Sequence, residues 1–478
     1  MIFCGVKPKF AILFLAALSP VGIFDSAAFS QSITLAPAGG PPGTSTQVSG
    51  TGFSAGASID LFFDNADEAP AIADGSGAFS NVAIPVPSSA LPGPHTVKAA
   101  LHGSGSSAEQ TFAVYTEWRQ GGFSPLLSGF NPFENILSPA NAGSLALQWK
   151  LAPGGALEGP PTLVNGIVYV SDSRKFVYAL NSETGATLWT FHAGQAVIGS
   201  PAVANGVVYF GSEDGMVYAL NARTGAKIWT FATSQAIVDH PTLTTGAVYI
   251  ASTNGIFYAL DPATGTKLWS FTTGADYTWH AAVANGVVYL PPGDNNLYAL
   301  DATSGAILWT FSTGVPINHP MVANGTVYVD SQNTYYALDA NTAAVLWTHA
   351  EGAHPGGLLG AGNGVVYCGT NDGYIQALRA STGAALWSTR LVSSTPLSPL
   401  TYSDAAIANG VLYLSANNGN IYAFNAQTGS RLWTYETRGN PNFGGPTGVI
   451  VANGKVLAAS AQTFDVYSFR LPGSAAER

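Results

Sequence analysis

Residues 201–231, PAVANGVVYFGSEDGMVYALNARTGAKIWTF, decide the fold of most of this 478-residue chain. Three tight turns divide the stretch into apolar segments, at Asn205-Gly206, Asp214-Gly215 and Thr224-Gly225. Such pairs accept the positive φ values that a two-residue hairpin requires. The stretch therefore predicts four antiparallel strands: the residues before Asn205, then Val207–Phe210, Met216–Leu220 and Ala226–Phe231.

This unit recurs along the chain, and a tryptophan closes each copy. The spacings between these tryptophans are 40, 40, 40, 40, 38, 40 and 46 residues. The tryptophans are Trp149, Trp189, Trp229, Trp269, Trp309, Trp347, Trp387 and Trp433. Four hairpin-linked strands in about 40 residues, repeated in series, are typical of β-propeller blades.

The two ends of the repeat region complement each other. Ser144–Leu151 has the pattern of a fourth strand that lacks its first three, whereas three strands without a fourth follow Trp433. Those three are Thr447–Val451, Lys455–Ser460 and Phe464–Leu471. Joining both ends in one sheet removes the exposed edges of an open array. We therefore predict an all-β fold, an eight-bladed propeller with a closure of three strands plus one.

The recurrent aromatic residues serve packing in this interpretation. Tyrosine recurs in the second strand, as in Tyr169 and Tyr209, and in the third, as in Tyr178 and Tyr218. A residue that every blade needs is a contact between blades, because a binding site rarely requires eight copies. Cys368 takes the position that apolar residues hold in the other repeats, so we expect it to be buried.

The net charge limits the expected partners, and the N-terminus indicates an exported protein. Only 9% of the residues are charged and the net charge is −10, which disfavours nucleic acid and anionic membranes as partners. Lys7 and Lys9 precede an apolar run, and small residues follow it, which predicts a signal peptide over residues 1–30. Cleavage between Ser30 and Gln31 would give a periplasmic or extracellular protein without a transmembrane segment. Cys4 precedes the apolar run, so a lipoprotein is not expected.

Three further segments complete the expected organisation. Alternating apolar runs with Gly and Pro turns in residues 32–115 predict a small antiparallel sandwich, and pieces such as Asp74–Phe79 resemble immunoglobulin-like modules of bacterial surface proteins. Residues 116–137 are expected to be a linker, residues 138–473 the propeller, and residues 474–478 a tail.

The repeat unit resembles that of the pyrroloquinoline quinone (PQQ) quinoprotein-like propellers, over about residues 120–473. This family includes PQQ-dependent alcohol dehydrogenases and a non-enzymatic lipoprotein of the outer-membrane barrel-assembly machinery. The resemblance to the dehydrogenases would imply PQQ with calcium, a calcium site of Glu, Asn and Asp, a catalytic Asp, and adjacent cysteines. No Cys-Cys pair occurs here, and no Cys-x-x-Cys-His motif for a c-type haem.

Where the repeats differ from one another, we expect the ligand site. At the start of the first strand, three consecutive repeats carry His240, His280 and His319, whereas a sibling repeat carries Ser200. The predicted ligand-binding residues at this propeller mouth are Asp239, His240, Asp276, Trp279, His280, Asn318, His319 and Asp404. Equivalent atoms of adjacent blades would lie about 8–10 Å apart, the spacing of packed sheets. We therefore expect no tightly bound metal. Because the cysteine pair of the dehydrogenases is missing, we also expect no cofactor and no catalytic residues.

Two functional hypotheses follow. The first is a non-catalytic binding or scaffold protein of the cell envelope or exterior, a monomer whose partner is a protein or an envelope or extracellular ligand. The alternative is a divergent PQQ-dependent alcohol dehydrogenase, with Trp279 as a stacking platform and Asp276 or Asp404 as the base.

Overall fold

The computed structural model describes residues 30–157, 159–273, 275, 280–350, 355–391, 403–437, 446–460 and 463–473. The predicted signal peptide, the tail 474–478 and two predicted site residues, Asp276 and Trp279, lie outside this part. Apart from the short 3-10 helix η1 (Ala142–Ser144), the regular structure of the described residues consists of strands. None of their helices is long and apolar enough to cross a membrane.

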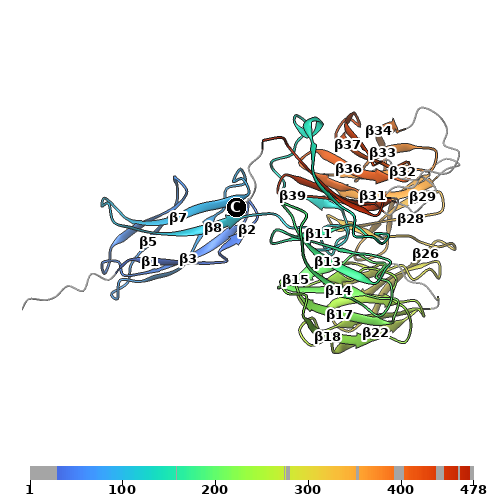
Figure 1. Ribbon diagram of the computed structural model, residues 1–478, viewed down its shortest axis with the longest axis horizontal. Coiled ribbons are helices and arrows are strands. Elements are labelled where there is room, and N and C mark those ends of the chain that lie inside the picture. The colour runs from blue at the N-terminus through green and yellow to red at the C-terminus, as the bar shows by residue number, and fades with distance from the viewer. Residues whose placement is uncertain are drawn as a thin grey trace, which may run out of the picture. The chain divides into compact units, whose positions relative to one another are not determined.

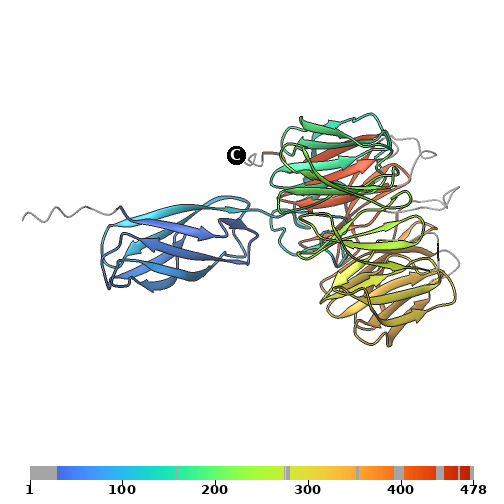
Figure 2. The same cartoon turned by 90° about the horizontal axis from the view of Figure 1, so that it is seen from below.

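The chain divides into two compact units. The first comprises residues 1–35, 47–84 and 97–110, and the second comprises residues 36–46, 85–96 and 111–478. Figures 1 and 2 show both units as packed strands.

The N-terminal strands form two sheets, in the orders β1-β3-β6 and β2-β8-β7-β4-β5. Their bounds are β1 (Ser32–Ala36), β2 (Gly39–Gly40), β3 (Ser45–Thr51), β4 (Ser58–Phe63), β5 (Ala66–Ile72), β6 (Phe79–Pro85), β7 (Gly93–Leu101) and β8 (Ser107–Val114). In the first unit, alternate residues of β4 are buried, namely Ile59, Leu61 and Phe63. This alternation is typical of a strand with one face on a core. An immunoglobulin-like relationship stays a prediction.

The second unit contains eight four-stranded antiparallel sheets in its described residues, and one of them gains the short strand β9 (Phe130–Asn131). Six sheets follow each other in chain order, each made of four consecutive strands. The first two are β11 (Thr162–Val164), β12 (Ile167–Ser171), β13 (Phe176–Asn181) and β14 (Thr187–His192), and β15 (Ala202–Ala204), β16 (Val207–Gly211), β17 (Met216–Asn221) and β18 (Lys227–Ala232). The next two are β19 (Thr242–Leu243), β20 (Val248–Ser252), β21 (Ile256–Leu260) and β22 (Lys267–Thr272), and β23 (Ala282–Ala284), β24 (Val287–Leu290), β25 (Asn296–Asp301) and β26 (Ile307–Ser312). The last two are β27 (Met321–Ala323), β28 (Thr326–Ser331), β29 (Thr334–Asp339) and β30 (Val345–Ala350), and β31 (Pro355–Gly362), β32 (Val365–Thr370), β33 (Tyr374–Arg379) and β34 (Ala385–Arg390).

A seventh sheet comprises β35 (Ala406–Ala408), β36 (Val411–Ala416), β37 (Asn420–Asn425) and β38 (Arg431–Glu436). The last sheet has the order β10-β41-β40-β39, with β10 (Ala146–Leu151), β39 (Pro446–Ala452), β40 (Lys455–Ser460) and β41 (Asp465–Arg470). The β10 strand pairs antiparallel with β41, from Ala146 opposite Arg470 to Leu151 opposite Val466. Two ends of the repeat region thus meet in one sheet, as the sequence predicts for a β-propeller.

The recurrent tryptophans connect neighbouring sheets, which confirms their predicted packing role. The indole N–H of Trp189 donates to the carbonyl of Ala222 at 2.9 Å, in the turn between β17 and β18 of the next sheet. The ring also covers Gly225, where an added Cβ would lie 2.8 Å from an indole carbon. The indole of Trp433 donates to the carbonyl of Leu145 at 3.0 Å, which continues the pattern across the closure.

Residues 118–131, which lie within the predicted linker 116–137, run along the inner strands of the second unit. Backbone N–H groups of two inner strands, β15 and β23, donate to them: Val203 to the Arg119 carbonyl at 2.7 Å and Val283 to the Pro125 carbonyl at 2.7 Å. Further contacts along the segment involve Leu163 with Trp118, Leu243 with Gln120, Val322 with Leu126, Ala361 with Ser128, Ile407 with Gly129, and Val451 with Asn131. The physical reason is that inner-strand edges carry backbone groups that need partners. We call residues 118–131 the inner segment.

Candidate functional site

The three histidines lie together because they occupy one register of three consecutive sheets. His240, His280 and His319 each come two residues before an inner strand, β19, β23 and β27 respectively. Inner strands of adjacent sheets converge on the same axis of a propeller. The side chains at the start of these strands therefore point to a common region, which we call the mouth.

The imidazole rings are closer to one another than the sequence suggested. Ring centroids of His240 and His280 are 4.1 Å apart, and those of His280 and His319 are 4.5 Å apart with an interplanar angle of 16°. The expected separation of about 8–10 Å, drawn from sheet spacing, does not apply to these rings. Side chains that lean toward the axis shorten the distance that the strands themselves keep.

Asp239 connects two of these rings. Its Oδ1 lies 3.2 Å from Nδ1 of His240 and 3.2 Å from Nδ1 of His280, and it also accepts the backbone N–H of His240 at 2.8 Å. Asp239 is 9% exposed and His280 is 8% exposed. A carboxylate this far from water is stable only with partners, and the two imidazoles supply them.

The pKa values at the mouth are displaced in opposite directions. Burial by itself would raise the pKa of Asp239, but the charges of His280 and His240 outweigh burial and hold that pKa below its usual range. Burial would likewise lower the pKa of His280, but the charge and the hydrogen bond of Asp239 and the charge of Asp404 raise it. Of the three histidines, His280 therefore holds a proton most readily, beside the ionised Asp239.

The other two histidines are neutral at neutral pH. Burial, followed by the positive charge of His280, lowers the pKa of His240 to about 4. The same two causes lower the pKa of His319 to about 4. Neutral imidazoles can accept a hydrogen bond or bind a metal ion, which protonated imidazoles cannot do.

Several polar atoms at the mouth are buried without a hydrogen-bond partner among the described residues. They are Oδ2 of Asp239, Nε2 of His240 and Oγ of Ser200. A buried polar atom without a partner costs about 1–3 kcal/mol, so such atoms indicate a ligand or a water molecule.

Sequence reasoning missed the contribution of Gly121 from the inner segment. A Cβ on Gly121 would lie 2.7 Å from Nε2 of His240, so only glycine leaves this nitrogen its space. The pair Gly121-Gly122, within a segment expected to be a linker, was the available signal.

The remaining predicted residues divide into three groups. The negative charge of Asp404 acts to raise the pKa of His240, His280 and His319, so Asp404 contributes to the electrostatics of the mouth. Asn318 instead donates from Nδ2 to Oδ2 of Asp330 at 2.6 Å. Asp276 and Trp279 lie outside the described residues.

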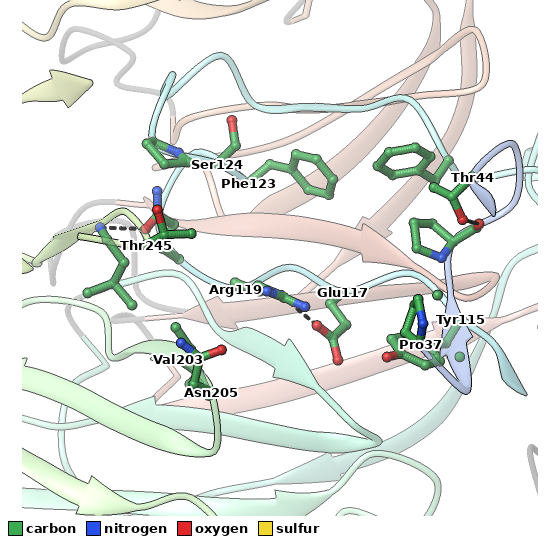
Figure 3. A pocket seen from close by; sticks show the side chains of 18 of the residues that line it. Pro37, Thr44, Tyr115, Glu117, Arg119, Phe123, Ser124, Val203, Asn205 and Thr245 are labelled. Atoms are coloured by element: carbon green, nitrogen blue, oxygen red, sulfur yellow. Dashed lines mark hydrogen bonds and ion pairs between the residues drawn. The ribbon is translucent and has the colours of Figure 1, made fainter. Parts of the chain in front are cut away.

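A separate cavity of about 630 Å³ lies in the second unit (Figure 3). Glu117, Arg119 and Phe123 line it together with Asn205 and Thr245. Nε of Arg119 is 2.6 Å from Oε2 of Glu117, so this charged pair is already satisfied internally.

The repeat region also matches a known family. The family model described as outer membrane protein assembly factor BamB matches residues 136–256 and 252–463. The chain belongs to this family of PQQ-type repeat proteins. No curated protein matches it.

Solved structures with low identity share the fold of this family member. BamB from Moraxella catarrhalis is 18% identical with a TM-score of 0.58, covering 68% of this chain and 99% of that one. Quinohemoprotein alcohol dehydrogenase from Comamonas testosteroni is 16% identical with a TM-score of 0.61, covering 76% and 82%. A europium-containing methanol dehydrogenase is 15% identical with a TM-score of 0.61, covering 74% and 98%. At these identities the likeness concerns the fold.

The described side chains of the mouth do not fit PQQ with calcium. Calcium takes six to eight oxygen ligands, whereas this mouth presents three imidazoles and the carboxylates of Asp239 and Asp404. The resemblance also implies adjacent cysteines, but the sequence has only Cys4 and Cys368, and Cys368 is buried in β32 as predicted. The imidazole nitrogens of the mouth instead suit a bound species that prefers nitrogen donors to oxygen donors.

Proposed function

We propose that this chain is an exported, non-catalytic binding protein whose ligand site is the mouth of the propeller. The observation that carries the proposal is the buried Asp239–His240–His280 cluster, in which Oδ2 of Asp239 and Nε2 of His240 have no hydrogen-bond partner among the described residues. Packing alone does not explain these residues, because the equivalent position of the neighbouring sheet is filled by Ser200. Groups that the fold leaves unpaired are available to a ligand.

Export and a protein partner belong to the same proposal. The N-terminal sequence supports export to the periplasm or the exterior, with a mature protein that begins at Gln31. The family name, an outer membrane protein assembly factor, supports partners that are proteins of the envelope. Mass spectrometry of the secreted or periplasmic protein should find Gln31 at the N-terminus; an intact residue 1 would contradict export with cleavage.

A matched pair of proteins tests the binding role. Wild-type protein and a variant with His240→Ser, His280→Ser and His319→Ser would be melted with divalent metal ions, organic acids and short peptides. Ser200 demonstrates that this register accepts serine, so we expect both proteins to fold. At least one ligand class should raise the melting temperature of the wild type only, by mass action on the folded state.

Reconstitution with PQQ and calcium tests the alternative. We expect no dye-linked alcohol oxidation and no change in the quinone absorbance. Turnover in the wild type, lost in the triple variant, would replace the binding proposal by an enzyme. Identical ligand profiles of the two proteins would remove the mouth as the binding site.

A further inference from the structure

The cluster at the mouth has the composition and the spacing of a metal site. One oxygen of Asp239 and one ring nitrogen each of His240 and His280 lie within 4.8 Å of one another. We propose that these three side chains bind one divalent first-row transition-metal ion. This inference rests on the proposed binding role of the mouth and names its ligand by chemical class. It also replaces the expectation of a metal-free mouth, because that expectation depended on rings held far apart.

The distances suit a small ion. Zinc binds imidazole nitrogen and carboxylate oxygen at about 2.0–2.2 Å, so two ligands of a tetrahedral site are about 3.3–3.5 Å apart. Asp239 Oδ1 lies 3.2 Å from Nδ1 of His240 and 3.2 Å from Nδ1 of His280. Both distances are therefore close to the separation that two ligands of one ion require.

The donor types select among cations. Two imidazoles and one carboxylate favour zinc, copper, nickel or cobalt, whereas calcium and magnesium prefer oxygen ligands. The chemistry therefore favours a transition metal over the calcium of the dehydrogenases.

The local charge also supports a divalent cation. Asp239 is 9% exposed, and its carboxylate lies 3.2 Å from a ring nitrogen of His240 and from one of His280. A buried carboxylate attracts a cation strongly, because water screens the charge only weakly there. Three protein ligands leave one position of a tetrahedral ion, which water or a donor atom of a partner would fill.

The inner segment also supports the site. Gln120 Oε1 accepts the N–H of Leu243 at 2.8 Å, and Gly121 follows directly against the His240 ring. These contacts hold the ring of His240 on one side while Asp239 holds it on the other. Such support of ligand orientation is typical of metal sites.

Metal binding is tested with the mature protein, residues 31–478, after chelator treatment and dialysis. Zinc stoichiometry would be measured by elemental analysis and zinc affinity by calorimetry. We expect one equivalent in the wild type and affinity at least about 100-fold weaker in Asp239→Asn and His280→Gln. His192→Gln, a change of an exposed histidine on β14, is the matched control and should bind as the wild type does.

Cobalt provides a measurement on the wild type alone. Cobalt bound by Asp239, His240 and His280 should give visible absorption bands of a four-coordinate ion, and zinc should displace them. These results remain informative even where a variant fails to fold. Sub-stoichiometric zinc in the wild type, or unchanged affinity in folded variants, would overturn the metal proposal. A melting shift with an organic acid or peptide that needs the three histidines would then still support the binding function.

Discussion

Two regions of the propeller follow opposite rules. The outer region repeats: indole N–H groups donate across neighbouring sheets from Trp149 to Trp433, always to a backbone carbonyl. The mouth varies: the same register carries Ser200 in one sheet and His240, His280 and His319 in the next three. Residues that recur in every sheet therefore serve the packing between sheets, whereas residues that differ between sheets form the candidate ligand site.

The largest effect is expected at the closure of the ring, where the outer region joins the two ends of the repeat. Deleting Ser144–Leu151 removes β10, which pairs with β41 and carries Trp149. We expect aggregation or loss of the cooperative melt, because β41 would have an exposed edge that recruits other strands. Light scattering and thermal melting measure this outcome, with Leu147→Ala as an exposed control in the same strand. A monomeric deletion variant with unchanged melting would show that the closure contributes little.

The mouth should respond to pH in a way that the outer region does not. His240 and His319 have folded pKa values of about 4, against about 6.5 when unfolded. The unfolded chain therefore binds more protons between these values, so stability falls as pH drops from about 6.5 to 4. The expected loss is up to about 1.4 kcal/mol per histidine and pH unit.

The other groups of the cluster act in different windows. Because the pKa of Asp239 is lowered in the folded protein, this group contributes stability above its unfolded pKa, and that contribution is lost only in strong acid. Because the pKa of His280 is raised, its contribution to stability is present below about pH 6.5 and is lost at higher pH. Urea melts from neutral pH to about pH 4.5, with a chelator present, measure the combined effect of these groups on the free energy of unfolding. A variant with His240→Gln and His319→Gln should lose less stability over this window; an equal loss would contradict the assignment.

A third prediction concerns one tryptophan of the outer region. Trp229→Ala should lower the free energy of unfolding by about 3–5 kcal/mol. The change removes the 3.0 Å hydrogen bond to the Pro262 carbonyl and the packing of the ring on Gly265. Its neighbour Ile228 is 50% exposed, so Ile228→Ala should change stability by less than about 0.5 kcal/mol. Similar losses of unfolding free energy in both variants would contradict a packing role of Trp229 between sheets.

The repeat made most of the propeller predictable, whereas the mouth was only partly so. Local turn chemistry fixes the strands: Asn205 and Gly206 have φ values of 50° and 76°, as a hairpin of this kind requires. The three histidines and Asp239 could be found from the sequence, because the histidines occupy equivalent positions at the start of the first strand in consecutive repeats and Asp239 directly precedes one of them. Their contact was not predictable, because it depends on how far side chains lean toward the axis. The inner segment was missed because it has no repeat and no alternation, and only the ring supplies its partners.

The smallest predicted effect separates two glycines that the repeat makes look alike. Gly206 and Gly225 have φ values of 76° and 70°, and alanine costs about 1–2 kcal/mol in that conformation. A Cβ on Gly206 meets nothing within 4 Å, but one on Gly225 would lie 2.8 Å from the ring of Trp189. Gly225→Ala should therefore cost about 1–3 kcal/mol more than Gly206→Ala, because it overpacks a contact between sheets. Denaturant melts of both variants measure the difference. Equal losses would mean that the glycine after Thr224 serves its turn alone, and that the indole yields to an added methyl group.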